Sequence, residues 1–187
     1  MSKSLYIFDF DDTLVDSGAR VRVDRASGDK EFYTSREYRD YDRLHKQPGD
    51  VLNFDEFDVY PPDAAVIPDV WSAFTSALSK LGTKYVMILT ARDNPVPVKE
   101  FLVNNGITDL PAIEAVGDSN PDAKKRVVAD YVQRLGISEV YLWEDSPNNI
   151  RSIESLASDD LKIKTTLVTE GLLRRFIQKI IRETFIS

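Results

Sequence analysis

The sequence predicts an α/β fold built on a doubly wound parallel sheet. Three observations favour this class: short apolar runs recur along the 187-residue chain, helix-like stretches alternate with them, and proline and glycine mark the ends of those stretches. The length argues for one domain, residues 1–187, and 42% apolar residues are enough for a hydrophobic core. We therefore expect a single sheet with helices on both faces.

The expected strands have apolar residues at both odd and even positions, as in a parallel sheet that is buried on both faces. The first reads Leu-Tyr-Ile-Phe-Asp. We predict five strands, at residues 5–9, 84–90, 112–117, 139–143 and 161–168.

Helices are predicted between these strands from their start and stop residues. Pro68 opens the first and Gly82 follows it, Gly106 follows the second, and Asn120 and Gly136 bound the third. A basic, apolar last helix is expected to pack on the sheet, with a membrane-surface helix as the alternative. The predicted helices span residues 67–81, 95–105, 121–135, 146–157 and 170–184.

Residues 15–65 interrupt the alternation of strands and helices. Residues 20–24 and 31–34 alternate in polarity around a turn, which predicts a β-hairpin. Residues 35–44 indicate a short helix, and residues 47–63 are acidic and loop-like. Because long loops inside a domain are usually functional lids, we expect a small hairpin-and-helix cap here.

Composition excludes several kinds of chemistry. The chain has no cysteine, which rules out disulfides, thiolate zinc sites and cysteine nucleophiles. A single histidine, His45, leaves no multi-histidine metal site, and we expect this side chain to be solvated. The net charge of −7 disfavours non-specific binding along nucleic acid. Any catalysis must therefore use carboxylates, hydroxyls, lysines or arginines.

The expected location is the cytoplasm. No apolar run is long enough to span a bilayer, so we expect no membrane partner. The first residues lead directly into a strand and then into acidic residues, which is unlike a signal peptide. The sequence indicates no protein partner.

Polar clusters follow the expected strands at one edge of the sheet, where parallel α/β proteins carry their reactive groups. The first strand ends in Asp9-Phe10-Asp11-Asp12-Thr13-Leu14, and the second in Thr90-Ala91-Arg92. A helix that begins Pro121-Asp122-Ala123-Lys124-Lys125 follows the third, and Glu144-Asp145 follows the fourth.

This ordered set resembles the haloacid dehalogenase (HAD) superfamily of phosphatases and phosphotransferases that use an aspartate nucleophile. The resemblance covers residues 5–157: a DxDxT motif, a threonine after a strand, a lysine on a helix and an acidic pair after another strand. It implies the strand order 5-4-1-2-3 and a small cap at residues 15–65. Asp12 stands where this family more often has glycine. Small capped HAD proteins of bacteriophages look similar, and a phage protein would act in the host cytoplasm.

Four carboxylates are expected at neighbouring strand ends: Asp9, Asp11, Glu144 and Asp145. Each close like-charge pair costs roughly 4 kcal/mol at an effective dielectric near 20, so they stay ionised only around a cation, or else take up protons. All-oxygen ligands favour Mg²⁺. We expect Asp9 and Asp145 to bind it through their side chains and Asp11 through its backbone carbonyl. Glu144 would bind directly or through water. Asp145 could alternatively cap the helix that follows it.

The same residues predict phosphoryl transfer. Asp9 would attack phosphorus and form an aspartyl-phosphate, and Asp11 would act as general acid and base. Thr90 and Lys124 would hold the phosphoryl oxygens, unless Thr90 is an ordinary strand-end hydroxyl. Lys125 is the alternative lysine, although it points away from the apolar face of its helix.

Two further residues have less direct roles. We expect Thr13 to orient the motif loop rather than to touch substrate. Arg92 lies two residues beyond the threonine that follows the second strand, where it could bind a second phosphate or a substrate carboxylate, or form a surface ion pair.

The predicted activity is a Mg²⁺-dependent phosphatase. Within the expected cap, residues 16–47 carry basic residues interleaved with Phe32, Tyr33, Tyr38 and Tyr41. This set could grip a nucleotide or a nucleic-acid phosphate end, or could form a salt-bridged surface. Sugar phosphates are the third substrate class. The alternatives are a non-catalytic phosphate-binding scaffold and a receiver-like phosphoacceptor, although receivers carry their hydroxyl and acidic groups after different strands.

Overall fold

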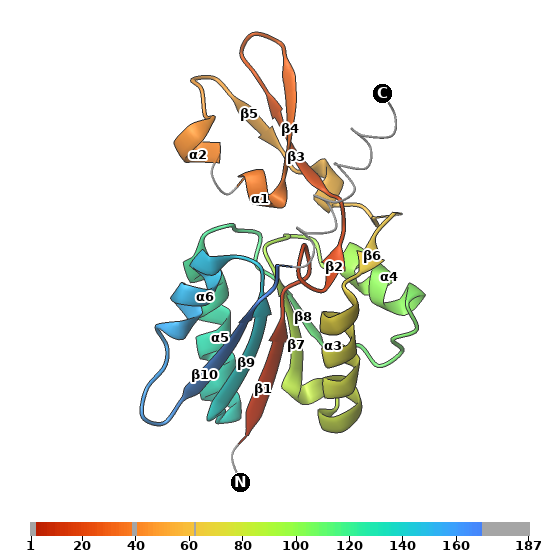
Figure 1. Cartoon of the computed structure of the whole chain (residues 1–187), viewed down its shortest axis with the longest axis vertical. Helices are drawn as coiled ribbons and strands as arrows, with labels where there is room; N and C mark the ends of the chain where they lie inside the picture. Colours follow the sequence, from red (N-terminus) through yellow and green to blue (C-terminus); the bar gives the residue numbers. More distant parts are fainter. Residues whose placement is uncertain (1–2, 39–40, 62, 170–187) are drawn as a thin grey trace.

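A five-stranded parallel sheet forms the centre of the computed structural model, which describes residues 3–38, 41–61 and 63–169 (Figure 1). The strand order is β10-β9-β1-β7-β8. Numbered along the chain, these strands stand in the order 5-4-1-2-3, so the prediction of a parallel α/β sheet is confirmed. The strands are β1 (Ser4–Phe8), β7 (Val86–Thr90), β8 (Ala112–Ala115), β9 (Glu139–Glu144) and β10 (Lys162–Leu167).

Helices cover both faces of the sheet, as a doubly wound fold requires (Figure 1). α3 (Pro68–Leu81) and α4 (Val96–Asn104) lie on one face, and α5 (Pro121–Leu135) and α6 (Pro147–Glu154) on the other. The central strand serves both: Phe8 packs in the core beneath α3 and α4, whereas Leu5 and Ile7 pack beneath α5 and α6. This explains why the first strand is apolar on both parities.

Local signals set most helix boundaries. Pro68 and Pro121 stand in the first turns of α3 and α5, where a missing N–H is not needed. The Asn120 side chain accepts a hydrogen bond from the Asp122 backbone N–H, and Gly136 ends α5 with a φ of 63°. A 3₁₀ turn, η2 (Thr83–Tyr85), replaces the start of the second expected strand. The expected helix 170–184 lies outside the described residues.

Residues 15–66, here called the insert, leave and rejoin the core through a short antiparallel pair, β2 (Val15–Asp16) with β6 (Ala65–Val66). β3 (Arg20–Asp24) and β4 (Lys30–Thr34) form the predicted hairpin. The expected helix 35–44 is present as α1 (Ser35–Tyr38) and α2 (Tyr41–Leu44).

The prediction that residues 47–63 are only a loop is wrong. β5 (Val51–Asn53) pairs with β3, and a 3₁₀ turn, η1 (Asp55–Phe57), follows it. The insert is therefore a three-stranded sheet, β4-β3-β5. Cross-strand pairing, which acidic composition does not reveal, stabilises this short strand.

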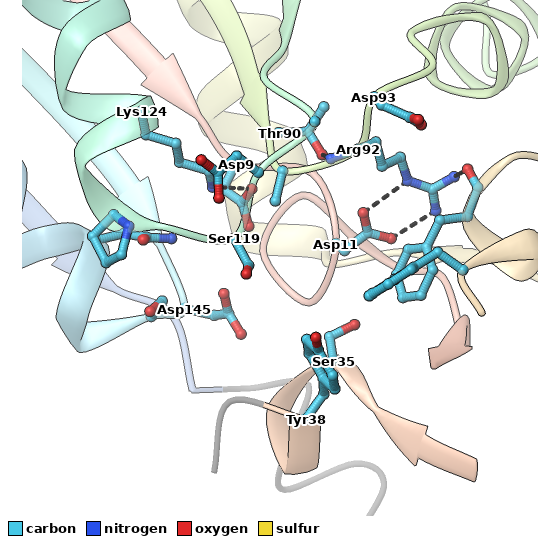
Figure 2. Close-up of a pocket in the computed structure, with 18 of the residues that line it drawn as sticks. Asp9, Asp11, Ser35, Tyr38, Thr90, Arg92, Asp93, Ser119, Lys124 and Asp145 are labelled. Atoms are coloured by element: carbon cyan, nitrogen blue, oxygen red, sulfur yellow. Dashed lines mark hydrogen bonds and ion pairs between the residues drawn. The ribbon is translucent and has the colours of Figure 1, made fainter. Parts of the chain in front are cut away.

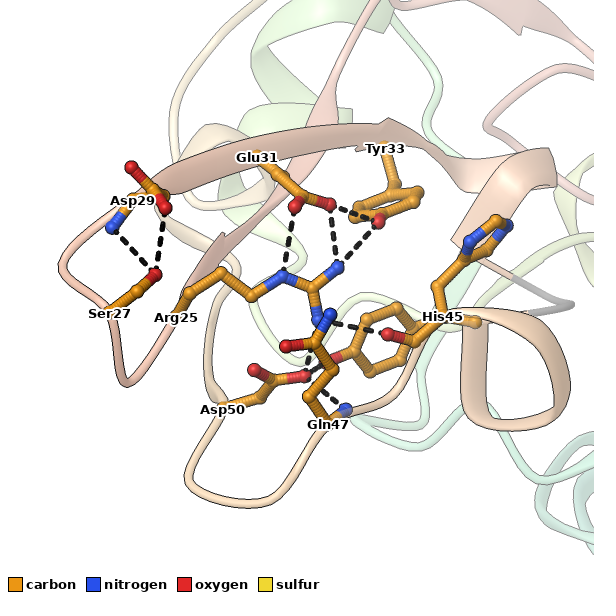
Figure 3. Close-up of polar contacts among 9 residues, drawn as sticks. Arg25, Ser27, Asp29, Glu31, Tyr33, His45, Gln47 and Asp50 are labelled. Atoms are coloured by element: carbon orange, nitrogen blue, oxygen red, sulfur yellow. Dashed lines mark hydrogen bonds and ion pairs between the residues drawn. The ribbon is translucent and has the colours of Figure 1, made fainter.

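A buried arginine organises the insert (Figure 3). Arg25 donates two hydrogen bonds to the Glu31 carboxylate, at 3.0 and 2.6 Å, and one of 2.6 Å to Asp50. Tyr33 also donates to Glu31, and Tyr41 donates to Asp50. Both donors to Glu31 lower the pKa of this carboxyl from 4.5 to about 2. Arg20 and Arg22 pair with Glu56 and Asp24, so these three insert arginines match the salt-bridged alternative.

Replacing Phe74 by alanine tests the core beneath α3. Phe74 is fully buried and packs edge-on against Phe8 at a centroid distance of 5.4 Å. We expect Phe74→Ala to lower the free energy of unfolding by about 3–5 kcal/mol, because a cavity replaces the ring. Urea unfolding measures this change. Val103 is 55% exposed, so Val103→Ala is the control. Its free energy of unfolding should stay within about 0.5 kcal/mol of the parent value. Equal losses in both variants would contradict the packing described.

The pH dependence of the insert follows from Glu31. Because its pKa is lowered on folding, the stability that it contributes is present above pH 4.5 and is lost as the pH falls toward about 2. We expect hydrogen-exchange protection factors in β4 to fall over this range while those in β1 do not. In Glu31→Gln the fall in β4 should be shallower. A parent and a variant with the same pH profile would show that the ion pair does not hold the hairpin.

Candidate functional site

A pocket of about 480 Å³ lies at the carboxyl edge of the parallel sheet, between the sheet and the insert (Figure 2). Strand register explains its position, because Phe8 of β1 stands beside Ile88 of β7 and Trp143 of β9. The residues that follow these three strands therefore meet at one edge. Seven of the eight predicted site residues line the pocket: Asp9, Asp11, Thr90, Arg92, Lys124, Glu144 and Asp145.

Asp9 lies at the floor of the pocket and is 5% exposed. One carboxylate oxygen, Oδ1, accepts a hydrogen bond of 2.6 Å from Lys124 Nζ. The other, Oδ2, accepts one of 3.1 Å from the Thr13 hydroxyl, so Thr13 contacts the motif aspartate as an orienting residue would. The backbone N–H of Asp9 donates to the Trp143 carbonyl at 3.0 Å, which ties the motif to β9.

Asp12 holds a left-handed backbone conformation with a φ of 60°, the single positive φ of a non-glycine residue in the described ranges. This conformation costs most side chains about 1–2 kcal/mol, but aspartate tolerates it better than most residues. The geometry explains why glycine is the commoner residue at this place in the motif of the resembling family. The loop turns here without a glycine, as the sequence requires.

Lys124 is the lysine that enters the pocket. Its ammonium group lies 2.6 Å from Asp9 Oδ1 and 2.8 Å from Glu144 Oε2, and the residue is 3% exposed. Both carboxylates raise the pKa of Lys124, although burial alone would lower it, so it stays charged. Lys125 is half-buried and does not line the pocket. Of the two alternatives, the geometry therefore supports Lys124.

Both carboxylate oxygens of Glu144 accept hydrogen bonds from neighbouring residues. Its Oε2 accepts from Lys124, and its Oε1 accepts from the Ser146 N–H at 3.1 Å and from the Asn149 side chain at 3.0 Å. These contacts favour the water-mediated form of its expected metal contact. Ser146 occupies the N-cap position of α6 without a side-chain capping hydrogen bond, so a cap from Asp145 stays a prediction.

Three carboxylates form a candidate cation site. Ligand oxygens of Asp9, Glu144 and Asp145 all lie within 4.8 Å of one another. Burial and the Glu144 charge raise the pKa of Asp9 to about 7 despite the nearby lysine, so negative charge is in excess here. An all-carboxylate donor set with excess negative charge fits Mg²⁺. The Asp11 carboxylate is outside this group, in line with the expectation that its side chain does not bind the ion.

Asp11 instead faces Arg92 (Figure 2). Arg92 Nε donates to Asp11 Oδ2 at 2.8 Å, and Arg92 Nη2 donates to Asp11 Oδ1 at 2.7 Å. The remaining nitrogen, Nη1, donates to the Phe57 carbonyl of the insert. Arg92 is 4% exposed, so it forms the ion pair that was the alternative to phosphate binding, but in the interior rather than at the surface. It also joins the sheet edge to the insert.

Two hydroxyl side chains also line the pocket, those of Thr90 and Ser119. Thr90 is buried, and its oxygen accepts from the Arg92 backbone N–H at 3.2 Å. Ser119 also lines the pocket, just before α5, and sequence reasoning missed it (Figure 2). Its position next to Asn120, the N-cap of the helix that carries Lys124, could have identified it from the sequence.

The insert contributes an aromatic wall that the sequence indicated only in part. Tyr38 belongs to the basic and aromatic stretch expected to grip substrate, and it lines the pocket. Phe54 and Phe57 also line it, although they come from the stretch expected to be a loop. Phe32 from the expected set does not line the pocket. His45 is exposed, as expected.

Comparisons with known proteins found no match among family models, curated proteins or solved structures. The resemblance to the HAD superfamily therefore rests on the ordered motifs alone. In the described part of the chain, no helix combines the length and the apolarity needed to cross a bilayer.

Binding of Mg²⁺ should stabilise the folded chain. At 100 times the dissociation constant, ligand binding adds about 2.7 kcal/mol, or roughly 5–10 °C in Tm for a chain of this size. Differential scanning fluorimetry with and without millimolar Mg²⁺ measures the shift. Asp145→Asn should abolish most of it. Asp69→Asn, the same change at an exposed position of α3, should keep it. An undiminished shift in Asp145→Asn would place the ion elsewhere.

Proposed function

We propose that this chain is a Mg²⁺-dependent phosphomonoester hydrolase of the HAD type, with Asp9 as the nucleophile. The observation that carries the proposal is the convergence of Asp9, Lys124 and Asp145 in one pocket at the ends of parallel strands. Each group suits phosphoryl transfer: a nucleophilic carboxylate, a buried cation and a carboxylate that completes a metal site. The sheet order is the one that the family resemblance implies.

The first step is attack by a carboxylate oxygen of Asp9 on phosphorus. A bond forms between this oxygen and phosphorus while the bond from phosphorus to the ester oxygen breaks, which gives an aspartyl-phosphate and an alcohol. Thr13 and Lys124 each hold one oxygen of Asp9, so the carboxylate orientation is fixed before substrate arrives. Thr90 and Ser119 line the pocket where their hydroxyls would hold the transferred phosphoryl group.

Asp11 is the general acid and base of this proposal. It gives a proton to the departing ester oxygen and later takes one from the water that cleaves the aspartyl-phosphate, releasing inorganic phosphate and restoring Asp9. Both Asp11 oxygens accept hydrogen bonds from Arg92, and Oδ1 also accepts one of 2.6 Å from Ser17. A leaving oxygen must therefore share Asp11 with Arg92, which makes Arg92 a positioning residue.

Asp9 and Asp145 would hold Mg²⁺ directly, and Glu144 would contact it through a water molecule. The ion would supply positive charge that offsets the repulsion between the Asp9 carboxylate and the phosphoryl group. Lys124 supplies the same kind of charge to Asp9 through its ion pair of 2.6 Å. Glu144 orients Lys124 through a hydrogen bond of 2.8 Å.

A phosphate-release assay tests the proposal. With Mg²⁺, the parent should release phosphate from at least one member of a panel of nucleotides, sugar phosphates, aryl phosphates and oligonucleotide ends. Asp9→Asn should lower kcat by about 10³-fold or more, because an amide oxygen cannot form the intermediate. In rapid-quench mass spectrometry, the parent should carry one phosphoryl group on Asp9.

Asp69→Asn is the matched control, since it makes the same chemical change at an exposed residue outside the pocket. Its kcat should equal that of the parent. The proposal fails if the parent releases no phosphate with Mg²⁺, or if Asp9→Asn turns over as fast as the control.

A further inference from the structure

The wall of the pocket opposite the predicted nucleophile is aromatic. Figure 2 shows Tyr38 on α1 across the pocket from Asp9 and Thr90. Phe54 meets the Tyr38 ring edge-on at a centroid distance of 5.5 Å, and Phe57 lies 6.3 Å beyond Phe54. These three rings therefore form a continuous aromatic surface on the insert side of the pocket.

Phe54 is open to solvent within this wall. It remains 43% exposed, although it belongs to a small sheet-and-turn unit with a core of its own. Phe57 is half-buried, and the Arg92 guanidinium lies 5.4 Å from the centre of its ring. An exposed ring that lines a concave pocket gains free energy when a flat apolar group covers it.

The charges around the same space are negative. Asp58, Asp93 and Asp118 line the pocket beyond the catalytic carboxylates. Asp58 and Asp93 interact through their side chains, and burial and then the Asp93 carboxylate raise the pKa of Asp58. A ligand with additional negative charge would meet repulsion here.

Among the residues that the structure describes, the pocket lining holds no unpaired cation that could offset this repulsion. Lys124 and Arg92 are the two basic residues in the lining, and both are already paired with pocket carboxylates. The described arginines of the insert that form ion pairs, Arg20, Arg22 and Arg25, do so with insert carboxylates and do not line the pocket. Aromatic contact is thus available to a leaving group, whereas the described lining offers no unpaired cation to a second phosphate.

We propose, on the basis of the proposed phosphatase function, that the substrate is a monophosphate ester whose leaving group carries a planar ring and no second phosphate. A nucleoside monophosphate has this chemistry. Its base would stack against Phe54 and Tyr38 while its phosphate reaches Asp9. The pocket volume of about 480 Å³ is within the range that small-molecule sites occupy. Nucleic-acid ends, which carry neighbouring phosphodiesters, are disfavoured.

Two substrate pairs isolate the contribution of the ring. Benzyl phosphate and cyclohexylmethyl phosphate are both esters of primary alcohols and differ in planarity. A nucleoside 5′-monophosphate and ribose 5-phosphate share the ester oxygen and differ in the base. In each pair we expect kcat/KM to favour the planar member by roughly 5- to 150-fold, the range that one stacked base contributes.

Phe54→Ala should remove most of this preference, chiefly through KM. Phe32→Ala is the matched control, because Phe32 is 47% exposed on the same insert but does not line the pocket. The control should keep the preference of the parent. Circular dichroism of both variants checks that the insert remains folded.

A third comparison tests the charge of the site. A nucleoside 3′,5′-bisphosphate should have a higher KM than the 5′-monophosphate, and the difference should shrink as salt is added. The substrate proposal is overturned if kcat/KM is equal within both ring pairs, if Phe54→Ala and Phe32→Ala behave alike, or if the bisphosphate is preferred. Phosphate release without ring preference would leave the phosphatase function standing, whereas no release from any ester would overturn both proposals.

Discussion

An imbalance of buried charge dominates this structure. Asp9 and Glu144 share one cation, Lys124, and Asp145 lies beside them, so carboxylates outnumber ammonium groups in a space that water barely reaches. Burial, together with the Glu144 charge, raises the pKa of Asp9. A divalent cation would remove the imbalance, and the same arrangement would aim Asp9 at an anionic ester. In the proposed function, this geometry would therefore link metal binding, nucleophile orientation and the choice of a phosphorylated substrate.

Sheet topology creates this arrangement from distant parts of the chain. β1 lies between β9 and β7, so Asp9 and Glu144 stand at adjacent strand ends although 134 residues separate them. Hydrophobic burial on both faces of β1 holds that register. Arg92 adds a second link, because one guanidinium pairs with Asp11 and also donates to the Phe57 carbonyl of the insert. Movement of the insert would thus change the surroundings of the proposed acid and base.

Local sequence patterns predicted the strands and helices of the core, but they predicted only part of the insert. Apolar runs and capping residues such as Asn120 located the sheet strands and the helices within the described ranges, and strand ends located the acidic motif. β5 was missed because its three residues are held by pairing with β3, a contact that lies outside any local window. The partner of Arg92 was undecided for the same reason: charge pairing across the pocket depends on tertiary structure. Phe54 was missed because residues 47–63 read as a loop.

A crystal structure of the protein with Mg²⁺ and beryllium fluoride, a mimic of the phosphoryl group, tests the central claim most directly. The account predicts beryllium bonded to a carboxylate oxygen of Asp9, with the ion coordinated by Asp9 and Asp145 and the fluorides facing Lys124 and Thr90. Fluoride density on any other residue, or an ion bound away from Asp9, would contradict it.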